Sequence, residues 1–578
     1  MCVHYFSNTS IVKLLWDTHN TDPITIGYFS HYTADKRERG MMKLKVAQNV
    51  LKTGKSVKVS DGVTAAKHCV SGCGYTGATQ TPRIDDLSDI SKSIDGANRS
   101  KESVVEKSRD RNFATVAVTA TETIVQEAPE PRGIPVFGTL LSFILAGGPK
   151  RQHEYVDRRH KELGSVYRER LGPITAVFVN STHEFRRVFR LEGSAPKHFL
   201  PEAWTLYNET RKCRRGLLFM DGEEWIYFRK ILNKVMLAPD PTNLMFQPCQ
   251  DAAVELREKW QKQIKTDAVI TNLQVQLYQW SLEAMMATLM GSCWHYYKQQ
   301  LSRDFEVLAE VLYKIFEYSA KLSVIPAKLA MNLRFPVWRK FVASADIAFE
   351  IVRTLVPEMT TLGGDGLLKK MMDEGIRAED AICIVTDFIL AAGDTTATTL
   401  QWTLLLLCNY PEKQEELFEQ LKDVPQRDLL RVPLLKGVIK ESFRLYPIAP
   451  FISRYLPKDS VIGNYFVPKG ELLVLSLYSS GRDAANFSQP NEFLPERWIR
   501  TEKGTYQGVM HPHGSLPFAL GARSCIGRKL AEIQISLALA QLVKSFKIEC
   551  INKDQVELIL HLISVPSKSI KLKLTERT

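Results

Sequence analysis

Apolar residues that recur every three to four positions dominate the chain from about residue 131 onward. This period predicts helices over Arg151–Leu163, Leu301–Lys321 and Phe335–Val356. The strongest pattern, Ala378–Asn409, stops before the pair Tyr410-Pro411. At about 1.5 Å per residue such a helix is roughly 45 Å long, which is enough to cross a whole domain. A further helix, Arg528–Ser545, is predicted near the C-terminus.

Strand-like stretches are shorter and fewer. Val166–Arg170 and Thr175–Asn180 flank the turn residues Gly172 and Pro173. Three further predictions follow from β-branched runs between turn signals: a hairpin of Val461–Val467 with Leu472–Tyr478 joined by Pro468-Lys-Gly470, and C-terminal strands at Val556–Val565 and Ile570–Leu574. The pattern therefore predicts a mainly α fold with small β-sheets, of the α+β class.

Residues 1–115 differ in composition from the rest. They are rich in Ser, Thr, Lys, Gly and Asp, and they contain no run of 18 apolar residues that would predict a membrane anchor. From Met41 a basic stretch without acids extends to Asp61 and resembles a mitochondrial transit peptide. We therefore interpret 1–115 as a targeting segment and disordered linker, with 1–40 an alternative or wrongly assigned start, and 116–578 as the catalytic domain.

The bulk charge adds a constraint on partners. Of the 578 residues, 76 are Lys or Arg and 64 are Asp or Glu, a formal net charge of +12. This balance favours an acidic partner, an anionic membrane surface or an organelle address, with an ordinary basic surface as the alternative. We expect no nucleic-acid partner. Ten cysteines spread over this length do not predict a disulfide framework.

One cysteine lies in an unusual setting. Cys525 stands between Gly521 and Gly527, two residues after Arg523 and just before the predicted helix from Arg528. This arrangement offers a thiolate from a tight loop with positive charge beside it. The alternative is a buried cysteine that acts as a small hydrophobic residue.

Polar residues interrupt the longest helix at its middle. Asp394 and Thr395 follow Gly393 within an apolar run, and an acid is costly to bury there unless it has a partner. A mid-helix Thr can bond back to the carbonyl four residues earlier and bend the helix, and Gly393 weakens it. The alternative is a set of capping residues at a helix break.

The pattern Phe-x-x-Gly-x-Arg-x-Cys-x-Gly, formed by Phe518 to Gly527, resembles the haem-binding loop of the cytochrome P-450 monooxygenases. The resemblance extends from Pro131 to Leu574 and implies that family's fold, with haem b between the long central helix and the cysteine loop. It implies that Cys525 is the axial iron ligand and that Asp394 and Thr395 relay protons to dioxygen, the co-substrate. Ala392 departs from the Gly that the family usually has there.

The same resemblance assigns further roles. The residues expected to bind the cofactor are Trp225, Arg229, Arg454, Arg523, Phe518 and Gly527. The expected buried ion network that retains the haem consists of Glu441, Arg444 and Arg497. The residues expected to dock a redox partner are Lys436, Lys440, Arg528 and Lys529, with solvated basic residues as the alternative. The expected substrate contacts, which serve equally well as core, are Trp204, Phe388, Ile448, Ala449, Phe451 and Leu562.

The basic positions and the missing anchor resemble the mitochondrial members of the family. That likeness implies an adrenodoxin-like 2Fe–2S ferredoxin and its reductase as partners, with NADPH acting only through them. It also implies peripheral contact with the matrix side of the inner membrane. Residues 203–208, 215–225, 446–457 and 513–518 resemble arthropod ecdysteroid 2-hydroxylases, which implies conversion of 2-deoxyecdysone to ecdysone. The alternatives are an ecdysteroid 20- or 22-hydroxylase, a haem-thiolate isomerase and a haem-binding carrier.

Overall fold

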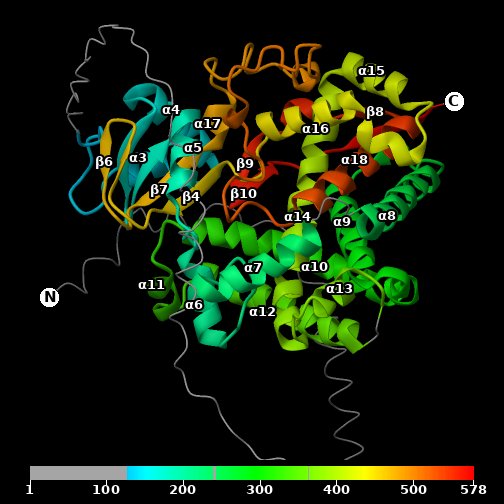
Figure 1. The fold of residues 1–578 in the computed structure, drawn as a ribbon, viewed down its shortest axis with the longest axis horizontal. Helices are drawn as coiled ribbons and strands as arrows, with labels where there is room; N and C mark the ends of the chain where they lie inside the picture. The colour runs from blue at the N-terminus through cyan, green and yellow to red at the C-terminus, as the bar shows by residue number, and fades with distance from the viewer. Residues whose placement is uncertain (1–125, 238–241, 362–363, 578) are drawn as a thin grey trace, which may run out of the picture. The chain divides into compact units, whose positions relative to one another are not determined.

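The computed structural model describes residues 126–237, 242–361 and 364–577. The predicted targeting segment and most of its linker lie outside these residues, so that interpretation stays a prediction. Within them, helices make up most of the structure, and small sheets lie beside them (Figure 1). The prediction of a mainly helical α+β fold is confirmed.

The helices carry most of the described chain. They are α3 (Leu140–Leu145), α4 (Gln152–Leu163), α5 (Thr182–Leu191), α6 (Glu202–Arg211), α7 (Gly222–Met236), α8 (Thr242–Gln263), α9 (Leu273–Met290), α10 (Trp294–Leu322), α11 (Ala327–Asn332), α12 (Pro336–Thr361), α13 (Leu367–Asp373), α14 (Ala378–Asn409), α15 (Pro411–Leu421), α16 (Pro433–Leu445), α17 (Leu477–Gly481) and α18 (Arg528–Ser545). The predicted bounds of α14 and α18 agree with the structure.

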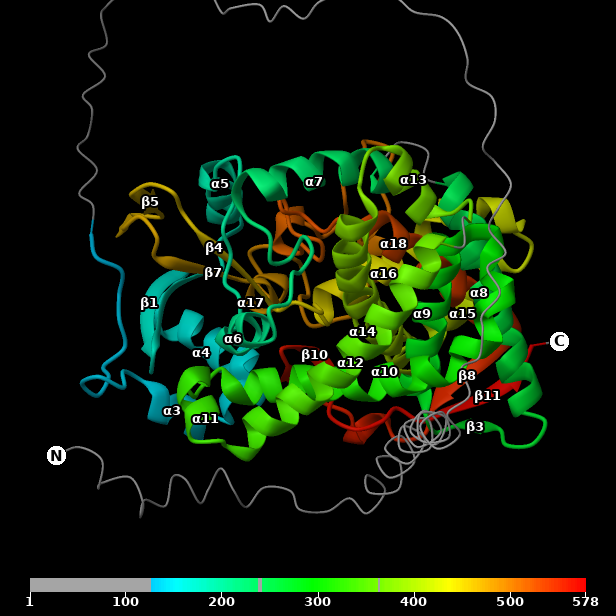
Figure 2. The same cartoon turned by 90° about the horizontal axis from the view of Figure 1, so that it is seen from below.

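Helix α14 forms the centre of the core. It packs against α9, α12, α16 and α18, and most of its side chains are buried. Its length and apolar composition would also suit a membrane span, but 72% of its most apolar window is buried inside the protein. Pro411 begins α15 directly after it, because proline is tolerated in the first turn of a helix but not inside one. Figure 2 shows α14 in the middle of the described chain, with α9, α10 and α12 beside it.

The strands form several small sheets. They are β1 (Val166–Leu171), β2 (Ile174–Val179), β3 (Val269–Ile270), β4 (Phe451–Tyr455), β5 (Ser460–Ile462), β6 (Tyr465–Val467), β7 (Leu472–Ser476), β8 (Phe546–Cys550), β9 (Leu558–His561), β10 (Ile563–Pro566) and β11 (Leu572–Glu576). The largest sheet has the order β1-β2-β7-β4, in which β7 runs parallel to β2 and antiparallel to β4.

Two strand predictions are wrong in their pairing. The predicted hairpin between Val461–Val467 and Leu472–Tyr478 does not form, because Val461–Val467 itself folds back at Gly463 (φ +61°) into β5 and β6. Strand β7 is almost fully buried and joins the larger sheet. Similarly, Val556–Val565 is not one strand: it reverses at Leu562 (φ +65°) into the hairpin β9–β10.

Candidate active site

The loop before α18 presents the cysteine. The backbone N–H of Cys525 donates to the carbonyl of Phe518 at 2.9 Å, which closes the loop on itself. The backbone takes positive φ at Ala519 (+57°) and Gly521 (+76°). Gly527 then ends the loop at the N-cap of α18. These turns leave the Cys525 side chain projecting from a short, backbone-rich segment.

The Cys525 side chain has accessible surface although the surrounding protein desolvates its thiol. The residue has exposed surface, whereas the surrounding protein desolvates the thiol strongly enough to raise its pKa. Both observations hold together if the thiol faces a space that the protein encloses rather than bulk solvent. Arg229 and Arg528 oppose this rise in pKa and favour the thiolate.

Helix α7 places a buried arginine beside the cysteine loop. Arg229 donates from Nε to Asn233 Oδ1 at 2.8 Å and from Nη2 to Ser524 Oγ at 3.4 Å. Burial lowers the pKa of Arg229, and no carboxylate within the described ranges forms an ion pair with it. Trp225, one turn earlier, lies under the guanidinium of Arg523 at 4.5 Å. The structure therefore brings Trp225 and Arg229 to the loop, and their contact with the cofactor stays a prediction.

A second buried arginine approaches from β4. Arg454 donates from Nε to Glu192 Oε2 at 2.6 Å, while its Nη2 is buried and has no partner among the described residues. Glu192 Oε1 also accepts the backbone N–H of Ala522 at 2.9 Å. Gly521 permits this approach, since a Cβ there would lie 1.9 Å from Glu192 Oε1. Glu192 thus joins Arg454 to the cysteine loop.

Arg523 is already engaged by the protein. Its guanidinium bonds to the carbonyl of Pro196, to the carbonyl of Met220 at 2.7 Å and to Asp221 Oδ1 at 2.6 Å. Burial lowers the pKa of Arg523 to about 10, and the positive charges of Arg454 and Arg229 act in the same direction, whereas Asp221 opposes the change. Arg523 therefore ties the cysteine loop to the segment before α7, and its contact with the cofactor stays a prediction.

Sequence reasoning missed two residues in this region, Glu192 and His198. Burial, then Arg523 and Arg454, lower the pKa of His198 to about 4, so this ring is neutral at pH 7 and lies near both arginines. Glu192 lies at the C-cap of α5. Neither residue belongs to a local motif, so the sequence does not mark them as part of the site. Their role becomes visible only from the burial of Glu192 and from the packing around His198 in the folded chain.

The two predicted catalytic residues of α14 differ in burial: Thr395 is half-buried, whereas Asp394 is fully buried. Thr395 Oγ1 donates to the carbonyl of Ala391 at 2.9 Å, the predicted back-bond, although α14 continues here without a break. Ala391 is exposed and Thr395 half-buried, so this one face of an otherwise buried helix is open. Asp394, in contrast, is 2% exposed, and burial raises its pKa to about 7 against a hydrogen bond from Thr398.

Glu441 lies at the centre of the predicted ion network and pairs with both Arg444 and Arg497. Its Oε1 accepts from Arg444 Nη2 at 2.7 Å, Arg497 Nε at 2.9 Å and the Leu494 backbone at 3.1 Å. Its Oε2 accepts from Arg444 Nε at 2.9 Å and Trp498 Nε1 at 2.7 Å. All three charged side chains are at most 2% exposed. The network ties α16 to the segment that precedes the cysteine loop.

The predicted basic residues also lie together. Lys436, Lys440 and Lys529 line a hollow of about 540 Å³, whose apolar lining includes Phe518 of the cysteine loop. Glu532 lies in the same hollow; burial raises the pKa of its carboxyl, and these lysines and Arg528 oppose that rise. This surface therefore combines positive charge with an apolar floor directly behind the loop, and Glu532 was not foreseen.

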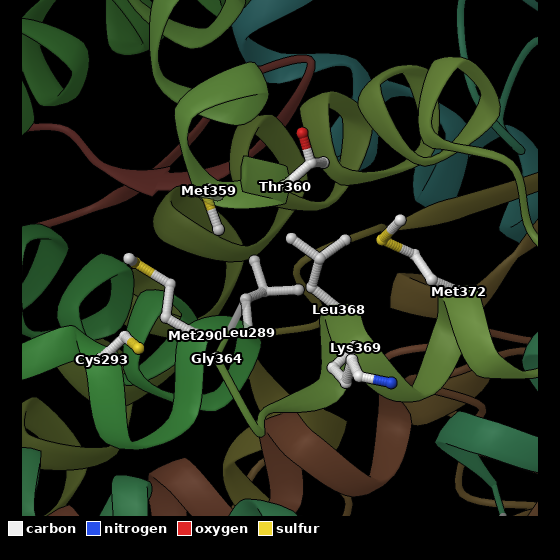
Figure 3. Close-up of a pocket in the computed structure, with 9 residues that line it drawn as sticks. All are labelled: Leu289, Met290, Cys293, Met359, Thr360, Gly364, Leu368, Lys369 and Met372. Carbon is white, nitrogen blue, oxygen red and sulfur yellow. The ribbon is translucent and has the colours of Figure 1, made fainter. Parts of the chain in front are cut away.

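The predicted substrate contacts divide into two groups. Trp204 and Phe388 are buried core residues. The residues that keep accessible surface are Ile448, Ala449, Phe451 and Leu562. The Ser564 backbone N–H donates to the Ile448 carbonyl at 2.9 Å, which holds the β9–β10 hairpin against the segment before β4. The Met-rich cavity shown in Figure 3 is lined mainly by residues of α9, α12 and α13, measures about 30 Å³ and is too small for an organic ligand of ordinary size.

These residues fit a haem. The Cys525 thiol would supply a ligand to the iron, and a buried guanidinium nitrogen of Arg454 has no acceptor among the described residues. Arg229 is buried near the thiol and carries an unpaired positive charge within the described chain. A flat group with two carboxylates would supply an acceptor for Arg454 Nη2 and a negative charge for Arg229.

Comparisons with known proteins agree with this chemistry. A family model described as Cytochrome P450 matches residues 128–574. The chain is 38% identical to Cytochrome P450 315a1, mitochondrial, of Drosophila melanogaster, over 78% of this chain and 88% of that protein. It is 30% identical to the mitochondrial cholesterol side-chain cleavage enzyme of Oncorhynchus mykiss, over 75% and 87%. It is 29% identical to the mitochondrial 1,25-dihydroxyvitamin D(3) 24-hydroxylase of Rattus norvegicus, over 78% and 90%.

Proposed function

The chain belongs to the cytochrome P450 family of monooxygenases, and on that premise we propose that it hydroxylates a steroid in the mitochondrion, with an ecdysteroid as substrate and C-2 as the position. The observation that carries the proposal is the accessible but desolvated thiol of Cys525 near two buried arginines: Arg454, whose Nη2 has no acceptor among the described residues, and Arg229, which has no carboxylate partner there. When bound, the haem supplies oxygen activation and the insertion of one oxygen atom into a C–H bond.

The chain's own residues hold the cofactor and manage protons. Arg229 and Arg454 would provide charge-assisted hydrogen bonds to the propionates of the haem. Glu192 accepts a hydrogen bond from Arg454 Nε at 2.6 Å and holds that side chain in place. Thr395 presents its hydroxyl on the open face of α14. Asp394 has a carboxyl whose pKa of about 7 allows it to give and take a proton near neutral pH.

The substrate class is inferred from relatives. The names of two similar proteins specify cholesterol and 1,25-dihydroxyvitamin D(3) as substrates of those proteins, which supports a steroid-like substrate here. The narrower assignment depends on the resemblance of residues 203–208, 215–225, 446–457 and 513–518 to the arthropod ecdysteroid 2-hydroxylase called shadow. An ecdysteroid 20- or 22-hydroxylase is the second candidate, because these enzymes share the family fold and the same kind of substrate.

The basic surface behind the cysteine loop supports an acidic electron donor. Lys436, Lys440 and Lys529 surround a hollow that reaches Phe518, and Arg528 begins α18 beside it. Such a surface suits an adrenodoxin-like ferredoxin, which would deliver electrons singly from NADPH through its reductase. The mitochondrial names of the relatives support this route.

Exposed apolar residues support peripheral membrane contact. Ile134, Val136, Phe137, Leu141 and Leu145 are 45–77% exposed and follow one another closely in and before α3. Clustered apolar exposure of this kind is typical of a protein or membrane contact. A steroid substrate partitions into membranes, so a contact here would bring the enzyme to its substrate.

The thiolate is tested by the reduced carbon-monoxide difference spectrum of the purified enzyme. We expect a Soret band near 450 nm, the signature of thiolate ligation, and its loss in Cys525→Ser. A correctly folded wild-type enzyme without this band would overturn the haem-thiolate assignment.

The substrate is tested by turnover with NADPH, ferredoxin and reductase against several ecdysteroid precursors. We expect conversion of 2-deoxyecdysone to the 2-hydroxylated product. A product hydroxylated at C-20 or C-22 would transfer the assignment to the second candidate, and binding without turnover would favour a carrier.

A further inference from the structure

Helix α9 packs along α14 at the position of the acid. Gly393 allows the ring of Tyr278 to lie directly against α14, since a Cβ there would be 2.6 Å from Tyr278 Cζ and 2.8 Å from its Oη. Ser281, three residues further along α9, donates to the carbonyl of Ala392 at 3.0 Å and fixes the register of the two helices. The Tyr278 hydroxyl therefore lies beside the residue that precedes Asp394.

Two polar atoms in this contact lack partners. Tyr278 Oη and Asp394 Oδ2 are both buried, and neither has a hydrogen-bond partner among the residues described. Buried hydroxyl and carboxyl groups are costly when they are left unsatisfied. Tyr278 packs against Gly393, the residue before Asp394, and interacts electrostatically with Asp394, so each of the two atoms could satisfy the other.

Few other groups influence Asp394. Its pKa reflects burial and the Thr398 hydroxyl, and within the described chain no Lys, Arg or His contributes to it. From α9, Tyr278 interacts electrostatically with Asp394 alone. From α10, Tyr313 also interacts with Asp394, but more strongly with Glu317. Among the described residues, the side chains that interact with Asp394 are therefore neutral hydroxyl groups.

We propose that Tyr278 is a positioning residue whose hydroxyl donates a hydrogen bond to Asp394 Oδ2 after a rotation of the Asp394 side chain. Tyr278 keeps its proton throughout, and its hydrogen bond orients the carboxyl and stabilises the ionised form. The inference rests on the proposed function, in which Asp394 and Thr395 handle protons for the oxygen chemistry.

Tyr278→Phe tests this inference, because it removes only the hydroxyl and keeps the ring that packs against Gly393. The readout is the infrared band of the protonated Asp394 carboxyl in the full-length enzyme, assigned by its loss in Asp394→Asn and titrated between pH 5 and 9. Loss of a hydrogen bond to the ionised form favours protonation. We expect the midpoint to rise by about one pH unit, a tenfold change in the ionisation constant.

Two further variants make the result specific. Gly393→Ala places a Cβ where the phenol lies and displaces it, so the midpoint should shift in the same direction. Tyr313→Phe is the matched control on α10, with an expected shift below about 0.3 pH units. An unchanged band and midpoint in Tyr278→Phe would overturn the inference, as would a shift in Tyr313→Phe instead.

The outcome is separable from that of the proposed function. The infrared titration needs no turnover, so absence of steroid hydroxylation would defeat the proposed function and leave the Tyr278 contact measurable. Normal hydroxylation with an unchanged infrared midpoint in Tyr278→Phe would defeat only the contact. In a positive result, Tyr278→Phe should also convert a smaller share of NADPH electrons into product.

Discussion

Replacing Glu441 by Gln removes the only negative charge from a buried group that contains two arginines. Glu441 is fully buried and accepts hydrogen bonds from Arg444, Arg497, Leu494 and Trp498. Glutamine has the same shape, but its amide nitrogen is a donor. If this amide nitrogen takes the place of Oε2, it faces two other donors, Arg444 Nε and Trp498 Nε1, which lie within 2.9 Å of that position and would lose their acceptor.

The cost follows from the unpaired charges. Breaking a buried ion pair by removing one partner costs about 3–5 kcal/mol, because the remaining charge stays buried. The unfolding entropy of roughly 450 ordered residues, at about 2.1 cal/mol/K each, is about 0.9 kcal/mol/K. We therefore expect Glu441→Gln to lower Tm by about 3–5 °C, with partial loss of haem because the network supports the segment before the cysteine loop.

The assay is thermal unfolding by far-ultraviolet circular dichroism, with haem content followed at the Soret band. Glu419→Gln is the control: Glu419 pairs with Lys422 at 2.7 Å, and both side chains are about half exposed. Exposed pairs contribute little, so this control should leave Tm unchanged. Equal Tm values for Glu441→Gln and the control would refute the reasoning that the network is held by its buried charge.

Two other predictions test the loop and the basic surface. Gly521→Ala should lower haem content and Tm more than Gly504→Ala, because both glycines have φ near +75° but only Gly521 faces an atom, Glu192 Oε1 at 1.9 Å. Equal effects would mean that the Glu192 contact is unimportant. Lys440→Gln should raise the KM for ferredoxin about two- to tenfold with kcat little changed, and weaken the salt dependence of the rate. Lys328→Gln, on α11, should do neither; an unchanged KM in Lys440→Gln would place the docking surface elsewhere.

Local signals in the sequence were sufficient for the elements and for the separate motifs. Helices α14 and α18 have the predicted bounds, because apolar period and proline position act through neighbours within a few residues. Glu441 and Arg444 are three residues apart on one helix, so their pairing follows from helical geometry. The signal of the Cys525 loop is equally local, because its cysteine, glycines and arginine lie within ten residues.

Only the tertiary structure decided which distant groups meet. Glu192 and Arg454 are 262 residues apart in sequence, and nothing periodic in either segment indicates their contact at 2.6 Å. The pairing of β7 with β2 and the approach of Tyr278 to Gly393 are of the same kind. Backbone preference and hydrophobic periodicity are properties of neighbouring residues, so they can be recognised in the sequence alone. Ion pairing, desolvation and close helix contact depend on how remote segments pack, and they appear only once the chain is folded.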